Sequence, residues 1–535
     1  MPQRRHALSA AVAVVLTSLP LPGTAALNPK DTSVQMFQWS WPDIARECTE
    51  WLGPQGYGAV QISPPHASKV ADGWWGVYQP VNYLDLTSRM GTPAQLQQMI
   101  DTCHAAGVRV YTDVVVNQMA DGSGTATDGS TWDGGSLRYP AFSGFDFHPH
   151  CVIQPADYDG PSGRQRVMDC RLGGLPDLAT ESGYVQGQIT DYLRRLLDMG
   201  VDGLRIDAAK HMPVAPWQAI LSAVRSTHPL TRQGEPLWVT QEIIPDGGVD
   251  RAAYFGLGTV NEFKFSYAMR QVFRGEDGLA LADIPALMGS WGQWGGSWGF
   301  MPPQHATVFV NNWDTERNGS SLTTANHSPG AVNDTVGTKR YDLANIFMLS
   351  QGYGEAQLHS GFRFTHHDDD RPAASPYRDG QPQINVVWDF VHRWSDISPL
   401  VKFRSAMAGQ PQQRWTVGDN RQQVAFNRGN AGFVALSNSG QTWQRTFATG
   451  LPAGTYCNVV QGTLTPDGSA CTGATITVQA DGSAALTIGP NDGSSVPAVV
   501  IYGPEGGRPG RQRLRGALHH RRGPHPVGPG GGRRG

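Results

Sequence analysis

Short apolar runs alternate with amphipathic stretches from about residue 33 to residue 360. Such runs are typical of strands buried in a parallel sheet, and an amphipathic stretch such as Val185–Met199 predicts a helix between two of them. Eight runs over roughly 330 residues match a parallel (β/α)₈ TIM barrel in number and size. The candidate strands are Val34–Gln38, Ala59–Ile62, Val108–Val116, Gly203–Ile206, Leu237–Thr240, Thr259–Phe265, Thr307–Val310 and Ile346–Leu349.

Two segments depart from this α/β pattern. After the third candidate strand, residues 117–178 are rich in Gly, Ser, Asp and aromatic residues, and a structureless loop of that length is uncommon in a compact domain. We therefore expect an inserted subdomain at 117–178, within a catalytic barrel made of 27–116 and 179–409. From 410 to 504, short alternating runs with turns predict a C-terminal antiparallel β-sandwich. Its candidate strands include Gln423–Phe426, Gly432–Leu436 and Thr475–Val478.

The two ends of the chain differ from the body in composition. Arg4 and Arg5 precede an apolar run, Ala7–Leu21, and small residues follow it. This order is typical of a secretory signal peptide, here over 1–26, and we expect the protein to be secreted and extracellular. Residues 505–535 combine Arg, Gly, Pro and His without periodicity, which predicts a disordered basic tail. GC-rich codons read out of frame would produce this composition, and a tail that binds an anionic surface is the alternative.

Composition also restricts the partners. Hydrophobic residues make up 39% of the chain and charged residues 16%, so a large core is expected. The formal net charge of −3 includes the arginines of both ends, and the body between them is acidic. An acidic body argues against a nucleic-acid partner, which would need a basic face. No segment reaches the length of a membrane span. We expect a monomer without nucleic-acid or membrane partners, and a neutral substrate fits.

Three carboxylates each follow a different candidate strand. Asp207 ends the run in GLRIDAAKH, Glu242 follows Leu237–Thr240, and Asp314 follows Thr307–Val310. A closed barrel would bring all three to the C-terminal mouth, where barrel enzymes perform their chemistry. Glycoside cleavage with retention needs one carboxylate to attack the sugar carbon and another to protonate the leaving oxygen. The joint placement therefore favours a glycosidase site over three unrelated surface charges.

Four segments in this order resemble the signature regions of the α-amylase family: DVVVN, GLRIDAAKH, TQEI and FVNNWDTER. The similarity extends from about Thr32 to Pro504, and CRLGGLPDL and WWGVYQPVNY are closest to secreted actinobacterial and animal-type α-amylases. The resemblance implies endo-hydrolysis of α-1,4-glucosidic bonds in starch and maltooligosaccharides with retention. In it, Asp207 is the nucleophile, Glu242 the general acid and then base, and Asp314 holds substrate hydroxyls.

The resemblance also implies supporting roles around these acids. Arg205 would keep Asp207 ionised and oriented, and Asp113 would buttress that pair. A buried structural ion pair is an equally good interpretation of Asp113. An aromatic platform for a sugar ring is implied at Trp74, Trp75 and Tyr78. Further substrate contacts are implied at Lys210, His211, Trp313 and Gln118.

A calcium ion between barrel and insert is implied as well. Its ligands would be Asn117, Asp177 and the backbone carbonyls of Met168 and His211, an all-oxygen set that suits Ca²⁺. The six cysteines permit fifteen pairings, and no C-x-x-C spacing suggests a zinc site, so structural disulfides are expected. The pairs implied by the resemblance are Cys48–Cys103, Cys151–Cys170 and Cys457–Cys471.

Three positions depart from the family pattern. Trp313 stands where the family usually has a histidine that hydrogen-bonds the sugar in the transition state, and Gln118 replaces another histidine. Gln357 stands where animal-type enzymes have an arginine that binds chloride, although Arg205 and Asn312 remain. We therefore expect no bound chloride and no chloride requirement. Two alternatives stay open: a maltooligosaccharide-forming or transglycosylating relative, and a weakly active starch-binding protein.

Overall fold

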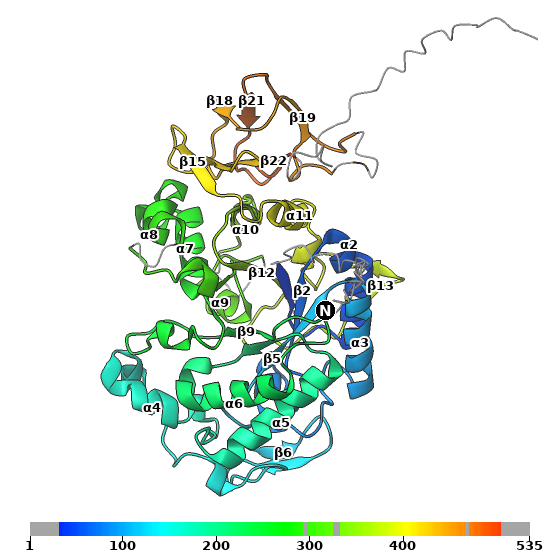
Figure 1. Ribbon diagram of the computed structural model, residues 1–535, viewed down its shortest axis with the longest axis vertical. Coiled ribbons are helices and arrows are strands. Elements are labelled where there is room, and N and C mark those ends of the chain that lie inside the picture. Colours follow the sequence, from blue (N-terminus) through cyan, green and yellow to red (C-terminus); the bar gives the residue numbers. More distant parts are fainter. Residues whose placement is uncertain (1–31, 293–296, 325–331, 464, 466–469, 504–535) are drawn as a thin grey trace, which may run out of the picture.

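A closed barrel of eight parallel strands forms the centre of the molecule (Figure 1). The computed structural model describes residues 32–503 except 293–296, 325–331, 464 and 466–469. The expected leader and basic tail lie outside the described residues. The strands follow each other around the barrel as β1, β12, β11, β10, β9, β8, β5 and β2. Their bounds are β1 Ser33–Met36, β2 Ala59–Ile62, β5 Arg109–Val114, β8 Gly203–Ile206, β9 Trp238–Gln241, β10 Thr259–Asn261, β11 Ala306–Val308 and β12 Glu355–Ser360.

One predicted strand is wrong. The run Ile346–Leu349 lies inside helix α10 (Arg340–Ser350), and the eighth barrel strand is β12. Every residue from Tyr341 to Ser350 is buried, because this helix packs against the barrel on one side and the C-terminal domain on the other. A helix buried on all sides has the continuous apolar run of a buried strand. The eighth strand, β12, has the sequence EAQLHS, whose polar residues interrupt the apolar run by which a buried strand is recognised. Gln357 and His359 of this strand form hydrogen bonds with residues of β1 and β2.

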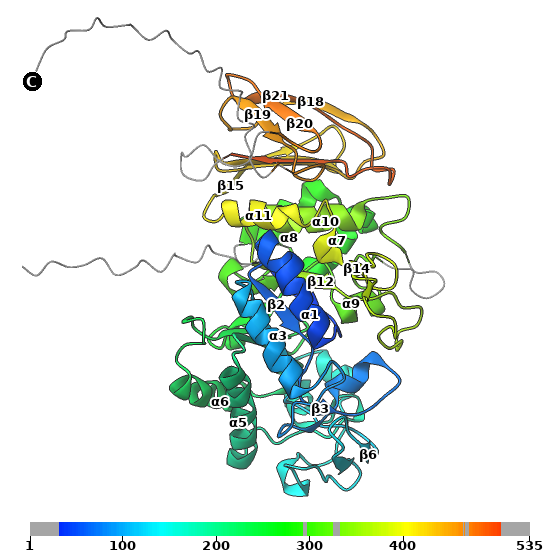
Figure 2. The same ribbon diagram turned by 90° about the vertical axis from the view of Figure 1, so that its right-hand side faces the viewer.

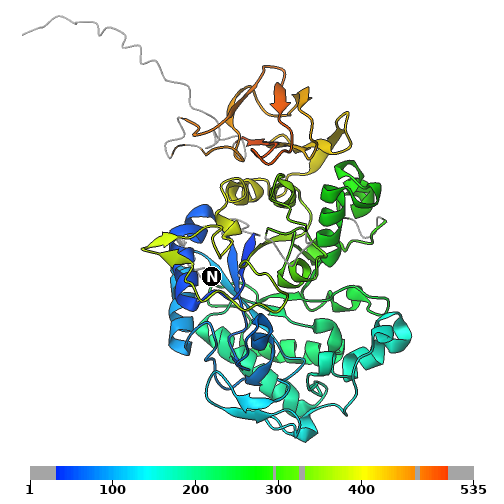
Figure 3. The ribbon, with the colours of Figure 1, turned by 180° about the vertical axis from the view of Figure 1, so that it is seen from behind.

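Helices cover the outside of the barrel, as Figure 3 shows from behind. The expected amphipathic helix at 185–199 is confirmed as α5 and ends at Gly200, whose φ of 107° lies in the left-handed region. A capping box between Thr92 and Gln95 begins α3. The helices are α1 Trp41–Glu47, α2 Gly53–Gln55, α3 Pro93–Ala105, α4 Arg164–Asp169, α5 Gly183–Met199, α6 Val214–Thr227, α7 Phe263–Arg274, α8 Ile284–Gly292, α9 Trp313–Arg317, α10 Arg340–Ser350 and α11 Pro399–Ala406.

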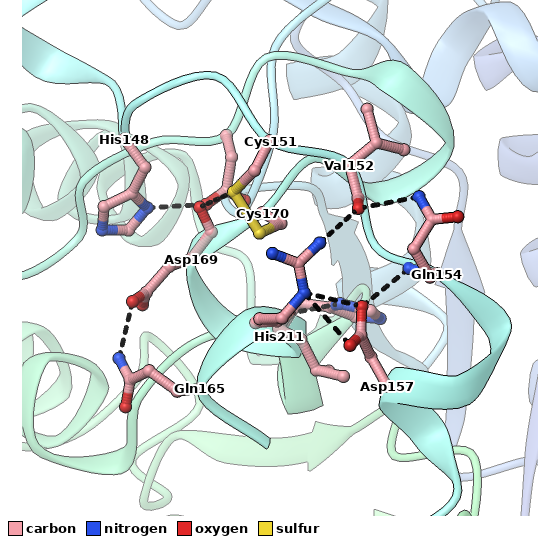
Figure 4. The surroundings of a disulfide bond; sticks show 12 residues. His148, Cys151, Val152, Gln154, Asp157, Gln165, Asp169, Cys170 and His211 are labelled. Atoms are coloured by element: carbon pink, nitrogen blue, oxygen red, sulfur yellow. Dashed lines mark hydrogen bonds and ion pairs between the residues drawn. A yellow bond between two sulfur atoms is a disulfide. The ribbon is translucent and has the colours of Figure 1, made fainter. Parts of the chain in front are cut away.

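A long segment without a barrel strand connects β5 to α5. It contains one small hairpin, β6 (Ser123–Thr125) with β7 (Thr131–Asp133), and the short helix α4. The disulfide Cys151–Cys170 joins α4 to the chain before it, with His148, Asp157 and His211 around it (Figure 4). The insertion after the third strand therefore has structure of its own.

The C-terminal part is all-β. Figure 2 shows its sheets stacked in two layers on helices α10 and α11, at the end of the molecule opposite the insert. One sheet has the order β15, β16, β17 and β22, and β18 pairs with β21 and β19 with β20, all antiparallel. Its strands are β15 Gln412–Val417, β16 Gln423–Arg428, β17 Gly432–Ser437, β18 Trp443–Ala448, β19 Gly454–Cys457, β20 Thr475–Val478, β21 Ser483–Ile488 and β22 Ala498–Tyr502.

The three implied disulfides, Cys48–Cys103, Cys151–Cys170 and Cys457–Cys471, are all present. Short strand pairs complete the described structure: β3 Ala67–Ser68 with β4 Pro80–Asn82, and β13 Tyr377–Arg378 with β14 Gln381–Pro382. Within the part of the chain that the structure describes, no helix combines the length and the apolar composition needed to cross a bilayer.

Candidate active site

The three predicted carboxylates emerge from neighbouring positions at the C-terminal end of the barrel. Asp207 directly follows β8, Glu242 directly follows β9, and Asp314 lies in the first turn of α9, a few residues after β11. Asp207 and Glu242 are buried at 8% and 7% exposure, and Asp314 is half-buried. The parallel register of β8 with β9 places both strand ends at the same level, so the two acids converge.

Arg205 connects the acids. Its Nη1 lies 2.7 Å from Asp113 Oδ1 and 2.7 Å from Asp207 Oδ1, and its Nη2 lies 2.7 Å from Glu242 Oε1. The guanidinium is 2% exposed, so these contacts are shielded from water. One fixed cation therefore orients Asp207 and Glu242 together, and the planar fork explains why lysine would not substitute for it.

Backbone and hydroxyl donors hold the same carboxylates. The Ala208 N–H donates to Glu242 Oε2 at 2.9 Å, and Ala208 adopts a left-handed conformation with φ 50°. The Tyr78 hydroxyl donates to Asp113 Oδ2 at 2.9 Å. The Gln118 amide lies 3.4 Å from Asp207 Oδ2. These bonds limit the movement of each acid before any substrate arrives.

The electrostatic environment differs among the acids. Burial and the neighbouring Glu242 charge raise the pKa of Asp207, although Arg205 opposes the shift. Burial, again with Glu242, raises the pKa of Asp314 well above its usual value. Clustered carboxylates with displaced pKa values are typical of acid–base sites. Within this site, carboxyl groups can therefore stay protonated at a pH at which isolated surface acids are ionised.

The predicted aromatic residues occupy different environments. Trp74 and Tyr78 are buried beside the acids and pack edge to face at 5.8 Å between ring centroids. Trp75 is half-buried under the Lys69 ammonium, 5.4 Å from its ring. Trp313 is stacked between Phe37 at 5.2 Å and Tyr78 at 5.6 Å.

Sequence reasoning missed part of this aromatic cluster. The Arg205 guanidinium lies 4.7 Å from the Trp313 ring, so the indole covers the cation that orients the acids. Phe37 was not predicted as a site residue, because it lies inside the apolar run Val34–Gln38, which indicated only a barrel strand, and no charged residue stands beside it. Arg317 stands in FVNNWDTER, the motif of Asp314, and lies over the rings of Phe37, Trp74, Phe362 and Phe364.

Lys210 and His211 are bonded to segments that neighbour the barrel mouth. The Lys210 ammonium donates to the Ile244 carbonyl at 3.1 Å and to Asp246 Oδ2 at 2.9 Å. His211 Nδ1 lies 3.0 Å from the Val167 carbonyl, and burial lowers its pKa to about 3. Both side chains thus connect the barrel mouth to neighbouring segments. Sequence reasoning missed Asp246, since PDGG reads as an ordinary turn.

The residues of the implied calcium site lie together. Asn117 Nδ2 donates to Asp177 Oδ1 at 3.2 Å, and the Asp169 charge contributes to the raised pKa of Asp177, about 6, for which burial is the main cause. The contact of His211 with Val167 brings His211 beside Met168. Among the described residues, no group of three or more His, Cys, Asp or Glu side chains could hold a metal. The implied set contains one carboxylate and depends on carbonyls.

At the implied chloride position, Gln357 is bonded to neutral groups. Its amide donates to Gln61 Oε1 at 2.9 Å and to Ser33 Oγ at 3.3 Å. Asn312 accepts from the backbone N–H groups of Asp314 and Thr315, which begins α9. Neither side chain brings a positive charge beside Arg205.

Comparisons with known proteins agree with this geometry. Residues 50–246 match the family model described as "Alpha amylase, catalytic domain", and residues 415–497 match "Alpha amylase, C-terminal all-beta domain". An α-amylase of Pecten maximus is 36% identical over 94% of this chain and 99% of its own length. One of Streptomyces violaceus is 38% identical over 85% and 74%. A structure of α-amylase I from Eisenia fetida in complex with maltohexaose has a TM-score of 0.76 at 32% identity, covering 88% of this chain and 97% of that one.

Proposed function

The chain belongs to the α-amylase family of glycoside hydrolases, and on that premise we propose that it cleaves internal α-1,4-glucosidic bonds of starch and related glucans with retention of configuration. The observation that carries this proposal is the pair Asp207 and Glu242 on a single guanidinium, Arg205. A retaining pair needs carboxyl groups about 5–5.5 Å apart, and two acids that share one guanidinium are necessarily close.

The first step uses each acid once. An Asp207 oxygen attacks the anomeric carbon, and the bond from that carbon to the glycosidic oxygen breaks as Glu242 donates its proton to this oxygen. The product is a covalent glycosyl-enzyme and a free glucan end. Asp207 must be ionised to attack, and the 2.7 Å contact of its Oδ1 with Arg205 Nη1, a nitrogen that Asp113 also holds, fixes its orientation.

The second step restores the enzyme. Glu242, now ionised, takes a proton from water, and the resulting hydroxide oxygen attacks the anomeric carbon while the bond to Asp207 breaks. Asp207 and water attack the anomeric carbon from opposite faces of the sugar. Each attack inverts the configuration at that carbon, so the two together retain it. Asp314 is the proposed partner for hydroxyls of the distorted ring, and Trp74, Trp75 and Tyr78 are the proposed aromatic contacts.

We also propose a calcium ion at Asn117, Asp177 and the carbonyls of Met168 and His211. Neither carbonyl accepts a hydrogen bond from another described residue, so both are available as ligands. Hard oxygen donors with one carboxylate suit Ca²⁺. When bound, the ion would tie the insert to the barrel mouth, next to the turn that carries Asp207.

Location and organisation remain part of the proposal. An extracellular enzyme with a removed leader is consistent with three disulfides, which persist in oxidising surroundings. The proposed substrates are starch and maltooligosaccharides, and the proposed form is a monomer. The proposed domain boundaries are those expected from the sequence, with barrel, insert and C-terminal β-sandwich.

Product analysis on soluble starch tests the function. The purified wild type should release maltooligosaccharides whose anomeric form matches retention, and Glu242→Gln should lower the rate by about 10²–10⁴-fold, because a positioned general acid contributes that much. Asp207→Asn should be equally impaired. A wild type that releases no more reducing ends than Glu242→Gln would reject the enzyme and favour the starch-binding alternative, and a single dominant oligosaccharide would favour the maltooligosaccharide-forming one.

A further inference from the structure

The loop that follows Glu242 is anchored by one side chain, Asp246. Its Oδ1 accepts the backbone N–H groups of Gly248 at 2.8 Å and Val249 at 2.7 Å, which closes the turn. Its Oδ2 binds the Lys210 ammonium at 2.9 Å, and both side chains are about nine-tenths buried. One carboxylate thus shapes the loop and binds it to the turn after β8.

The inserted segment covers the other side of the same loop. The Lys210 ammonium lies 4.6 Å from the centre of the Tyr158 ring. The Gly247 N–H donates to the Tyr158 carbonyl at 2.9 Å. The Lys210 ammonium therefore contacts the loop through Asp246 and the insert through the Tyr158 ring. Cation–π contacts of this kind are stronger when they are shielded from water.

Two glycines permit this close approach. A Cβ atom at Gly247 would lie 2.2 Å from the Asp159 carbonyl oxygen, and one at Gly248 would lie 2.7 Å from that of Gly160. Any side chain there would push the loop and the insert apart. The glycine pair in PDGG is therefore a contact surface as well as a turn.

We infer that Asp246, Lys210 and Tyr158, with Gly247 at the backbone contact, form a clasp that fixes the loop 243–250 against the insert and so sets how the leaving part of the glucan is received. The inference rests on the proposed function, because Glu242 is there the donor to the leaving oxygen. We place the loop that begins at the next residue on that same side of the broken bond. Asp246 is a positioning residue, since it acts through the loop and touches no reacting atom.

Two variants separate the clasp by different routes. Asp246→Asn keeps an oxygen for the turn but removes the charge that holds Lys210, whereas Gly247→Ala drives a methyl group into Asp159. The matched control is Asp250→Asn, which removes a charge from the same loop, where Asp250 Oδ1 accepts the Ala252 N–H at 3.0 Å and the asparagine keeps that oxygen. Each is assayed on maltoheptaose and on chloronitrophenyl maltotrioside, whose leaving group is not a sugar.

A clasp predicts a split between the two substrates. Both variants should lose about ten-fold in kcat/KM on maltoheptaose, mainly through KM, and stay within about two-fold on the trioside, because only a sugar leaving group meets the loop. Asp250→Asn should be unchanged on both. Equal losses on both substrates, or no loss on either, would overturn the clasp.

Amide hydrogen exchange gives a readout independent of turnover. In Asp246→Asn, the Gly247 amide and residues 155–163 of the insert should exchange faster than in the wild type, while Asp250→Asn should match the wild type. Unchanged exchange would overturn the clasp even if activity changed. A wild type inactive on both substrates would instead reject the proposed function, and the exchange result would still decide the clasp.

Discussion

At the scale of single residues, the site depends on one buried cation with several negative partners. Arg205 contacts Asp113, Asp207 and Glu242, so the ionisation of Asp113 and Asp207 depends on the charges around them. Asp113 is fully buried and accepts a hydrogen bond from the Tyr78 hydroxyl. It shares Arg205 Nη1 with Asp207, the proposed nucleophile, so its negative charge weakens the stabilisation that Arg205 gives to ionised Asp207. Its electrostatic role can be separated from a purely structural one.

Asp113→Asn should move the acid limb of the pH profile to lower pH. The Asp113 charge contributes to the raised pKa of Asp207, after burial and Glu242, so its removal lowers that pKa and Asp207 stays ionised in more acidic solution. We expect a shift of about one pH unit in the limb of kcat/KM on maltoheptaose. Asp198→Asn, an exposed control on α5, should leave the limb in place. An unmoved limb in Asp113→Asn would show that Asp113 is only structural.

At position 313 this chain has a stacked tryptophan where the family usually has a histidine that hydrogen-bonds the sugar. We expect Trp313→His to raise kcat/KM on starch about ten-fold, because an imidazole can donate to the sugar in the transition state. The same change should lower the free energy of unfolding by about 1–2 kcal/mol, since the stacking on Phe37 and the contact with Arg205 are lost.

Trp313→Phe is the matched comparison for this prediction. It keeps a ring for stacking and supplies no donor, so its kcat/KM should stay near the wild-type value while its stability falls less. Steady-state kinetics and urea unfolding measure both quantities. A Trp313→His enzyme slower than Trp313→Phe would contradict the role assigned to the histidine position.

At the scale of elements, a buried ion cluster ties α1 to the chain after β14. Glu47 Oε2 lies 2.8 Å from His392 Nε2 and from Arg393 Nε, and Glu47 Oε1 lies 2.8 Å from Arg393 Nη2. The Tyr377 hydroxyl also donates to Glu47. Burial by itself would raise the pKa of Glu47, but the His392 and Arg393 contacts lower it to about 2.

Glu47→Gln should therefore destabilise the fold in a pH-dependent way. A carboxyl whose folded pKa is about 2, against an ordinary 4.5, stabilises the fold fully above its unfolded pKa, and the gain is lost as pH falls towards 2. The expected loss in Glu47→Gln is about 3 kcal/mol at neutral pH and shrinks below about pH 4.5.

Urea unfolding between about pH 3 and pH 7 checks the size and the slope of this effect. Glu50→Gln is the control, because Glu50 is an exposed partner of Arg46 and Arg393 and should cost less than about 1 kcal/mol. A difference between wild type and Glu47→Gln that stays constant over this pH range would argue against an ionised Glu47 in the fold.

At the scale of the whole molecule, the insert is joined to the barrel mainly by local contacts. The disulfide Cys151–Cys170 closes a loop within the insert and does not reach the barrel. Contacts between the insert and the barrel mouth include His211 Nδ1 with the Val167 carbonyl, the Gly247 N–H with the Tyr158 carbonyl, and Lys210 with the Tyr158 ring. The proposed calcium ion would sit among these contacts and add to them.

Removal of calcium should release the insert first. A chelator should lower the unfolding midpoint and expose residues 117–178 to limited proteolysis, and added Ca²⁺ should restore both, since an ion at a hundred-fold excess over its Kd stabilises the fold by about 2.7 kcal/mol. Asp177→Asn should behave like the chelated wild type. An Asp177→Asn protein that responds to chelation as the wild type does would place the ion elsewhere.

The sequence by itself determined the barrel, the C-terminal β domain and the convergence of Asp207, Glu242 and Asp314. This was possible because strand periodicity is local and the mouth of a closed barrel follows from its topology. The strand prediction failed at Ile346–Leu349, where a helix buried on all sides lacks the polar face that marks most helices.

Only the tertiary structure decided what surrounds the acids. Asp207 and Glu242 share Arg205, Trp313 covers that guanidinium, and Asp246 contacts Lys210. These contacts join residues from separate strands and loops, so no local sequence pattern predicts them. The same holds for the carbonyls of the proposed calcium site, because a backbone oxygen has no signature in the sequence. Local structure and residue chemistry can be predicted from neighbouring residues in the sequence. The distances between residues far apart in the sequence are set only by folding.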